Sequence, residues 1–220
     1  MDYLGLITST FEKAAHPADA VAMTQYLKNQ FAHLGIKTPA RRQMISEMMK
    51  AHGYPPIAEM PALINALWML PEREYQYAAI DIMQKMPKQW TAAHIELFEW
   101  MMVHKSWWET VDNTISYLVA PLLKRFPALQ PATTDQWIKS NDMWLQRAAI
   151  TFQNGYKKDT DEALLFRYIL HCSGSKEFFI QKAIGWSLRE YAKTSPEAVK
   201  RFVGAHPLAA LSVREALRRL

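Results

Sequence analysis

Apolar residues recur every three or four positions along most of the chain, which is the spacing of one face of an α-helix. The stretches LINALWML (63–70) and LLFRYIL (164–170) show this spacing clearly. The breaks between such stretches are short, and no long linker rich in glycine, serine or proline separates them. The pattern therefore predicts an all-α chain of many short helices joined by short loops.

Helix starts can be predicted from capping residues and prolines. Four starts are indicated in this way: Thr38-Pro39, Pro61, Pro71 and Ser195-Pro196, with Thr38 and Ser195 as N-caps. The run SWWE from Ser106 has the spacing of a capping box, so we expect a helix to begin at Trp107. Asn141 is a similar candidate cap before MWLQRAAI. Within a helix, Trp107 and Trp108 point about 100° apart, so one can be core while the other lines a surface.

These features recur with a period of 35 residues. Ser106 and Asn141 are separated by 35 residues, and Gln76, Gln146 and Gln181 follow one another at steps of 70 and 35. Repeats of this length, each a pair of helices, are typical of an α-solenoid with HEAT-like units. We therefore expect residues 1–220 to form one solenoid domain. The alternative is chance recurrence within an ordinary helical domain.

The same register brings charged and aromatic side chains together. Asp112, Arg147 and Lys182 occupy equivalent positions in successive repeats, so stacked helices would place them side by side. Trp108 precedes Asp112 by one helical turn, and Trp186 follows Lys182 by one turn. An acid, two cations and two indoles suit a charged, flat ligand better than a dry core.

More ordinary roles are also open to these side chains. Asp112 and Arg147 could form only a salt bridge between repeats, and Lys182 and Arg189 could be solvated charges. Tryptophans of helical domains usually lie in the core, as we expect for Trp68, Trp90, Trp100 and Trp137. The register thus predicts a site without identifying its reaction.

Composition and charge narrow the possible functions. The formal net charge is +5, which permits a polyanionic partner but does not require one. The single cysteine, Cys172, cannot form an internal disulfide, and there is neither a membrane-spanning apolar run nor a signal-like N-terminus. These features predict a cytoplasmic protein. The seven histidines show no metal-binding spacing, so we expect no metal site. Phosphate-binding glycine loops and the G-x-S-x-G motif are absent, which argues against nucleotide-driven and acyl-transfer enzymes.

The sequence closely resembles the AlkD family of bacterial DNA alkylation-repair glycosylases. The resemblance runs from about Tyr26 to Arg214 and is carried by five segments in order: YLKNQFAHLGIKTPARR, LWMLPEREYQYAAIDIMQK, VHKSWWETVD, WLQRAAI and SKEFFIQKAIGWSLREYAK. It implies a right-handed α-solenoid of HEAT-like repeats with a concave DNA-binding face. It further implies a monomeric, cofactor-free and monofunctional glycosylase of the bacterial cytosol and nucleoid. Its substrate would be double-stranded DNA with cationic N3- or N7-alkylated purines.

The family's functional residues can be placed on this chain one at a time. The catalytic aspartate matches Asp112 in KSWWETVD, and the two lesion-flanking tryptophans match Trp108 and Trp186. The family's arginine matches Arg147, in WLQRAAI, and its tyrosine matches Tyr26. Lys182 and Arg189, which are not matched to the family's site, are further expected DNA-binding residues. Of the residues matched to the family's site, only Tyr26 is indicated by the resemblance alone.

One departure from the family and one alternative function remain. The chain ends at Leu220 without the further basic tail expected of relatives, which predicts that part of the family's DNA affinity is missing. The alternative is a HEAT-like scaffold that binds DNA or protein on its concave face without catalysis. Base release would distinguish this scaffold from a glycosylase, whereas DNA binding alone would not.

Overall fold

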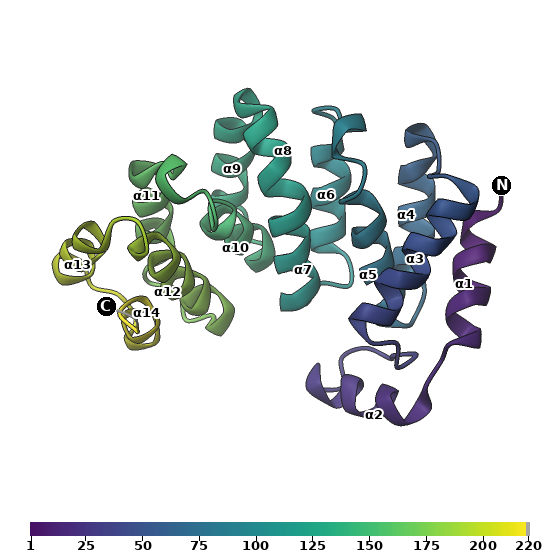
Figure 1. Cartoon of the computed structure of the whole chain (residues 1–220). Coiled ribbons are helices and arrows are strands. Elements are labelled where there is room, and N and C mark those ends of the chain that lie inside the picture. Colours follow the sequence, from purple (N-terminus) through teal and green to yellow (C-terminus); the bar gives the residue numbers. More distant parts are fainter. Residues whose placement is uncertain (219–220) are drawn as a thin grey trace. The chain divides into compact units, whose positions relative to one another are not determined.

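The computed structural model of the chain describes residues 1–218 and is almost entirely helical (Figure 1). Within these residues, β-structure is limited to one bridge, between Ala32 and Glu72. This result confirms the all-α fold class. The low count of seven glycines agrees with it, because glycine weakens helices. The chain divides into two compact units, Met1–Leu97 and Phe98–Leu220.

The first unit is built from five helices and the start of a sixth. Their bounds are α1 (Tyr3–Lys13), α2 (Pro17–Tyr26), α3 (Thr38–His52), α4 (Met60–Met69), α5 (Arg73–Met83) and α6 (His94–Val103), which crosses into the second unit. Two short 3₁₀ turns, η1 (Ile57–Glu59) and η2 (Pro87–Gln89), lie in the loops. Helix α4 packs against α1 and α5, and α5 also packs against α3.

A buried carboxylate fixes the loop between α2 and α3. Glu74 on α5 accepts hydrogen bonds from the backbone N–H groups of Leu34, Gly35 and Ile36 at 3.0, 2.9 and 3.0 Å. Gly35 has φ +89°, and a Cβ there would lie 2.1 Å from the carbonyl oxygen of His16. Only glycine therefore fits this position without a shift of the backbone.

The second unit contains the remaining helices. Their bounds are α7 (Trp108–Thr114), the π-helical turn η3 (Ile115–Val119), α8 (Ala120–Arg125), α9 (Gln130–Lys139), α10 (Met143–Thr151), α11 (Glu162–Cys172), α12 (Phe178–Ala192), α13 (Pro196–Ala205) and α14 (Ala210–Ala216). Two 3₁₀ turns, η4 (Pro127–Leu129) and η5 (Lys157–Asp159), precede α9 and α11. The π-helical turn lies just before Pro121, which has no N–H for a normal helical bond.

Helices of the second unit alternate between two layers. In one layer α10 packs between α7 and α12, and α12 also packs against α14. The other layer includes α9, α11 and α13: α9 contacts α11, and Phe166 of α11 stacks on Phe202 of α13 with ring centroids 4.1 Å apart. Contacts of α9 with α10 and of α13 with α12 join the layers. Every predicted residue of the site except Tyr26 lies on α7, α10 or α12.

The predicted helix starts are partly wrong in detail. Pro61 lies in the first turn of α4, which begins one residue earlier at Met60, and Ser195 does occupy the N-cap position of α13. Thr38 is already the first residue of α3 and Lys37 is its cap, while α5 begins at Arg73, two residues after Pro71.

The two predicted caps in the second unit are corrected as well. Helix α7 begins at Trp108 rather than Trp107, and the Ser106 hydroxyl donates back to the carbonyl oxygen of Met102 at 2.6 Å instead of capping it. The cap of α10 is Asp142 rather than Asn141. The Asp142 carboxylate accepts from the N–H groups at positions 144 and 145, at 2.7 and 3.1 Å.

A repeated contact gives the 35-residue period a structural basis. Gln76, Gln146 and Gln181 each donate from Nε2 to the carbonyl oxygen six residues earlier, at 3.0, 2.8 and 3.0 Å. Each glutamine thus ties the second helix of a pair to the loop before it. This contact argues against chance recurrence, because it repeats in geometry as well as in sequence.

Three of the four predicted core tryptophans are confirmed: Trp68, Trp90 and Trp137 are buried. Trp100 is partly exposed instead, and its ring stacks on His104 with centroids 4.5 Å apart. His104 lies one turn later in the chain, so its ring can cover one face of the indole.

Candidate functional site

The centre of the candidate site is an ion pair between neighbouring helices. Arg147 on α10 donates from Nε to Oδ1 of Asp112 and from Nη2 to Oδ2, both at 2.7 Å. This two-bond arrangement fixes the plane of the carboxylate as well as its position. The Asp112 side chain retains 18% exposure while that of Arg147 retains 6%, so the carboxylate is the more accessible partner.

Helix α12 also contacts Arg147. Its Nη1 donates to the backbone carbonyl oxygen of Phe179 on α12 at 2.7 Å. Its guanidinium carbon lies 5.9 Å from the ring centre of Trp186, also on α12. These contacts use three of the five N–H donors of the guanidinium, which is therefore held rigidly while donors remain for another acceptor.

Burial and the pairing with Arg147 shift the pKa of the Asp112 carboxyl in opposite directions. Burial raises its pKa above the ordinary value, and the charge of Glu109 adds to this effect. The hydrogen bonds and the charge of Arg147 lower it. Burial is the larger effect, so the pKa of Asp112 is raised on balance even with Arg147 beside it.

The aromatic side chains around this pair differ in their surroundings. Trp107 lies against Phe179 and Trp144, with ring centroids 5.3 and 6.2 Å apart, and so belongs to an aromatic cluster between helices. Trp108 and Trp186 are both partly exposed, and so is Trp107. All three indoles therefore keep some accessible surface, and what distinguishes Trp107 is its contact with the aromatic cluster.

The sequence predicts a row of Asp112, Arg147 and Lys182. In the structure Lys182 pairs elsewhere. The Lys182 ammonium pairs with Glu215 of α14, with Nζ 2.9 Å from Oε1. Arg189 donates from Nη1 to Oε2 of the same glutamate at 2.5 Å and to its backbone carbonyl oxygen at 3.2 Å. Both predicted DNA-binding cations of α12 thus share one carboxylate that the sequence reading did not identify.

Tyr26 lies in the first unit, at the exposed end of α2. It lines a cavity of about 240 Å³ together with residues that include Lys37 and Tyr77. Asp19 also lines the cavity, and the Lys37 ammonium pairs with it, with Nζ 3.0 Å from Oδ2.

Comparison with known proteins decides the family. The sequence profile of the DNA alkylation repair enzyme family matches residues 7–220. The chain belongs to this family. The resemblance to AlkD-like proteins seen in the sequence is thereby confirmed at the level of the family.

Solved structures agree with this assignment. A predicted DNA alkylation repair enzyme from Enterococcus faecalis is 30% identical, with a TM-score of 0.88 over 94% of this chain and 96% of that one. AlkD2 from Streptococcus mutans has a TM-score of 0.61 at 14% identity, over 89% of this chain and 96% of that one. The smu.31 structure from Streptococcus mutans UA159 has the same score and identity, over 82% and 99%. At 14% identity, these two likenesses show a shared fold. The curated proteins include no significant match.

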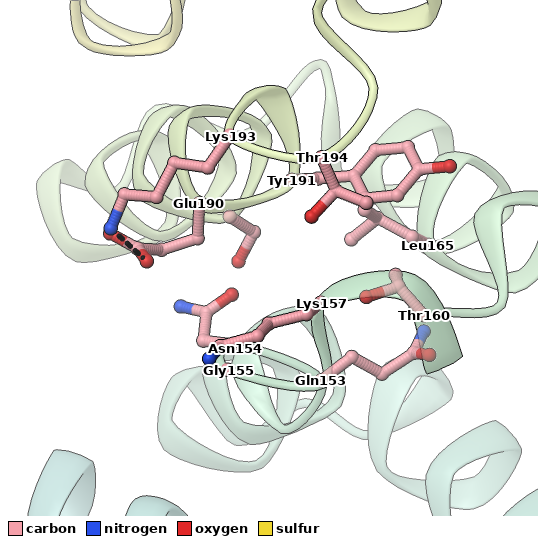
Figure 2. Close-up of a pocket in the computed structure, with 11 residues that line it drawn as sticks. Gln153, Asn154, Gly155, Lys157, Thr160, Leu165, Glu190, Tyr191, Lys193 and Thr194 are labelled. Carbon is pink, nitrogen blue, oxygen red and sulfur yellow. Dashed lines mark hydrogen bonds and ion pairs between the residues drawn. The ribbon is translucent and has the colours of Figure 1, made fainter.

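This family member also has a cavity of about 270 Å³ in its second unit, lined mainly by residues of polar type (Figure 2). It lies between the loop after α10 and the last turns of α12, where Asn154 faces Glu190, and an ion pair of 2.5 Å joins Glu190 to Lys193. All seven predicted site residues are described in the structure, and none of them lines this cavity.

The described part of the chain includes neither a cluster that could bind a metal ion nor a membrane-spanning helix. Across residues 1–218, nowhere do three or more His, Cys, Asp or Glu side chains gather in a way that could hold a metal ion. The helices in that range all lack the combination of length and hydropathy needed to span a membrane.

Glu215 is the partner of two predicted site residues that the sequence did not indicate. It stands in SVREAL, a segment displaced by two residues from the 35-residue register, and so was not aligned with the site. A shift of two residues aligns Glu215 with Lys182 of the preceding repeat, and this offset is the signal that could have found it.

Proposed function

We propose that this DNA alkylation repair enzyme is a monofunctional DNA glycosylase. It would hydrolyse the N-glycosidic bond of N3- and N7-alkylated purines in double-stranded DNA and leave an abasic site. One observation carries the proposal: a carboxylate, Asp112, is oriented by two hydrogen bonds from Arg147 beside the partly exposed Trp186.

The chemistry of the substrate explains why a carboxylate is needed. Alkylation at N3 or N7 makes the purine cationic and therefore a good leaving group. As the bond between C1′ and the base nitrogen breaks, positive charge moves onto the deoxyribose. A fixed carboxylate close to that sugar becomes more strongly attracted as the charge develops, which lowers the barrier. Asp112 would supply this field and orient the attacking water.

Arg147 would act mainly as a positioning residue. Its bidentate hydrogen bonds hold the carboxylate plane, and its positive charge favours the ionised form of Asp112. The donors that remain on the guanidinium could also meet a phosphate near the lesion. No general acid is required, because the leaving base is already activated.

The tryptophans would hold the damaged nucleotide. Trp108 and Trp186 are partly exposed and can contact the sugar and the backbone through their ring faces. Aromatic faces attract cations, so this contact would strengthen as the sugar becomes positive. Tyr26, Lys182 and Arg189 would contribute to DNA binding.

The proposal also covers the fold of the chain, its oligomeric state and the compartment in which it acts. The two-layer arrangement of the second unit and the repeated glutamine contact support a right-handed α-solenoid of HEAT-like repeats. Its concave face would bind DNA. We propose that the protein acts as a monomer in the bacterial cytosol and nucleoid, without metal or cofactor.

The test is to incubate the purified protein with methylated duplex DNA and to quantify free methylpurines by mass spectrometry. The wild type should release N3-methyladenine or N7-methylguanine, and Asp112→Asn should release little above the spontaneous rate. Thermal melts of both proteins confirm that they are folded. Absence of release by a folded wild type that binds the DNA would overturn the glycosylase and favour a non-catalytic scaffold.

A further inference from the structure

Helices α12 and α14 of the second unit are joined by a group of three charged side chains. Glu215 accepts from Lys182 at Oε1, at 2.9 Å, and from Arg189 at Oε2, at 2.5 Å. Because each carboxylate oxygen receives one cation, Glu215 bridges two basic residues of α12. Two positive charges and one negative charge leave a local net charge of +1.

The backbone of α14, rather than this ion pairing alone, sets the position of Glu215. Gly185 of α12 has no side chain, and a Cβ there would lie 2.5 Å from Cβ of Glu215 and 2.8 Å from the carbonyl oxygen of Ser212. Ser212 donates from its hydroxyl to the carbonyl oxygen of Gln181 at 2.9 Å. Close packing and this hydrogen bond therefore hold α14 on α12 even without the charge of Glu215.

The three side chains differ in their access to solvent. Lys182 is 36% exposed, Arg189 19% and Glu215 11%, so an anion arriving from solution can reach the cations. Hydrogen bonds from Lys182 and Arg189, together with their charges, hold the pKa of Glu215 below its ordinary value, so it is ionised at neutral pH. A phosphate diester carries the same charge as this carboxylate and accepts the same kinds of hydrogen bond.

We propose that Lys182 and Arg189 form a binding site for a DNA backbone phosphate, and that Glu215 competes with the phosphate for these two cations. This inference rests on the proposed function, in which the chain binds DNA. In the free protein Glu215 keeps both cations extended and in place. In the complex it weakens their hold on the phosphate, which limits affinity for undamaged DNA and for the abasic product.

The direct test compares Glu215→Gln with a matched control, Glu190→Gln. Each removes one negative charge; Glu190 is on α12 but pairs with Lys193. Fluorescence anisotropy measures binding of a short undamaged DNA duplex over a range of salt concentrations. Glu215→Gln should bind about three- to tenfold more tightly at ~0.1 M salt and steepen the salt slope by about 0.9, the value for one phosphate. Glu190→Gln should change affinity by no more than about twofold, because its charge acts only through general screening.

Equal effects of the two substitutions, or weaker binding by Glu215→Gln, would overturn the proposal that Glu215 competes with the phosphate. Lys182→Gln provides a second test that leaves the contact between Arg189 and Glu215 to help hold α14. It should flatten the salt slope by about 0.9, since the phosphate loses one cation. An unchanged slope would mean that Lys182 serves only α14.

Failure of this inference and failure of the proposed function can be told apart. Release of methylpurines by the wild type is measured on the same preparation. No release would overturn the glycosylase, whereas the salt slopes would still decide whether Glu215 competes with phosphate.

Discussion

At the scale of single residues, the proposed catalysis depends on how Arg147 affects the ionisation of Asp112. Burial penalises the ionised carboxylate, while the charge and hydrogen bonds of Arg147 favour it. The pKa of Asp112 is raised on balance. Only the ionised form can stabilise a cationic sugar, so activity should fall as the pH drops and Asp112 gains a proton.

Arg147→Ala should move this acidic limb to higher pH. Without the guanidinium, burial acts unopposed and raises the pKa of Asp112 further, so the carboxylate is lost nearer to neutral pH. The measurement is the single-turnover rate of methylpurine release against pH, after subtraction of the spontaneous rate. An acidic limb at the same pH as in the wild type would show that Arg147 does not control the ionisation of Asp112.

Part of this site could be predicted from the sequence, and the reason is the repeat. Asp112 and Arg147 lie one period apart, and the structure brings them into direct contact. The partner of Lys182 and Arg189 could not be predicted in this way, because Glu215 falls outside the register. Which of two adjacent tryptophans faces the cluster also depends on packing: Trp107 reaches Phe179, which a single sequence does not reveal.

At the scale of helices, the presence of a helix was easier to predict from the sequence than the residue at which it begins. The apolar spacing identified the helices around LINALWML and LLFRYIL, and both are present as α4 and α11. Their starts depend on which of several neighbouring polar side chains bonds to the first turn. Asn141 and Asp142 are both good caps by residue type, and only the backbone conformation selects Asp142.

This choice can be tested on α10, the helix that carries Arg147. Asp142→Ala should lower the free energy of unfolding by about 1 kcal/mol, because two N–H groups lose their acceptor. Asn141→Ala is the matched control and should change it by less than about 0.5 kcal/mol. Urea unfolding followed by circular dichroism measures both. Equal losses, or a larger loss for Asn141→Ala, would show that the cap is assigned to the wrong residue.

At the scale of the whole molecule, helical pairs at a fixed period produce an all-α member of the DNA alkylation repair enzyme family. In the second unit, the candidate site is formed by side chains that successive helices contribute, since α7 supplies Asp112, α10 supplies Arg147 and α12 supplies Trp186. No single repeat holds the site. The sequence pattern could predict that several helices contribute to the site. The close packing of α14 on α12 could not be predicted in this way, because it depends on tertiary structure.

The most direct test of the central claim separates chemistry from binding in Asp112→Asn. Single-turnover release of methylpurine is measured with protein in excess over methylated duplex, and Kd for the same duplex is measured in parallel. We predict a rate about 10²- to 10³-fold lower, as for loss of a preorganised electrostatic group, with Kd unchanged within about threefold. An unchanged rate would contradict the account, as would a loss of activity matched by an equal loss of binding in a folded protein.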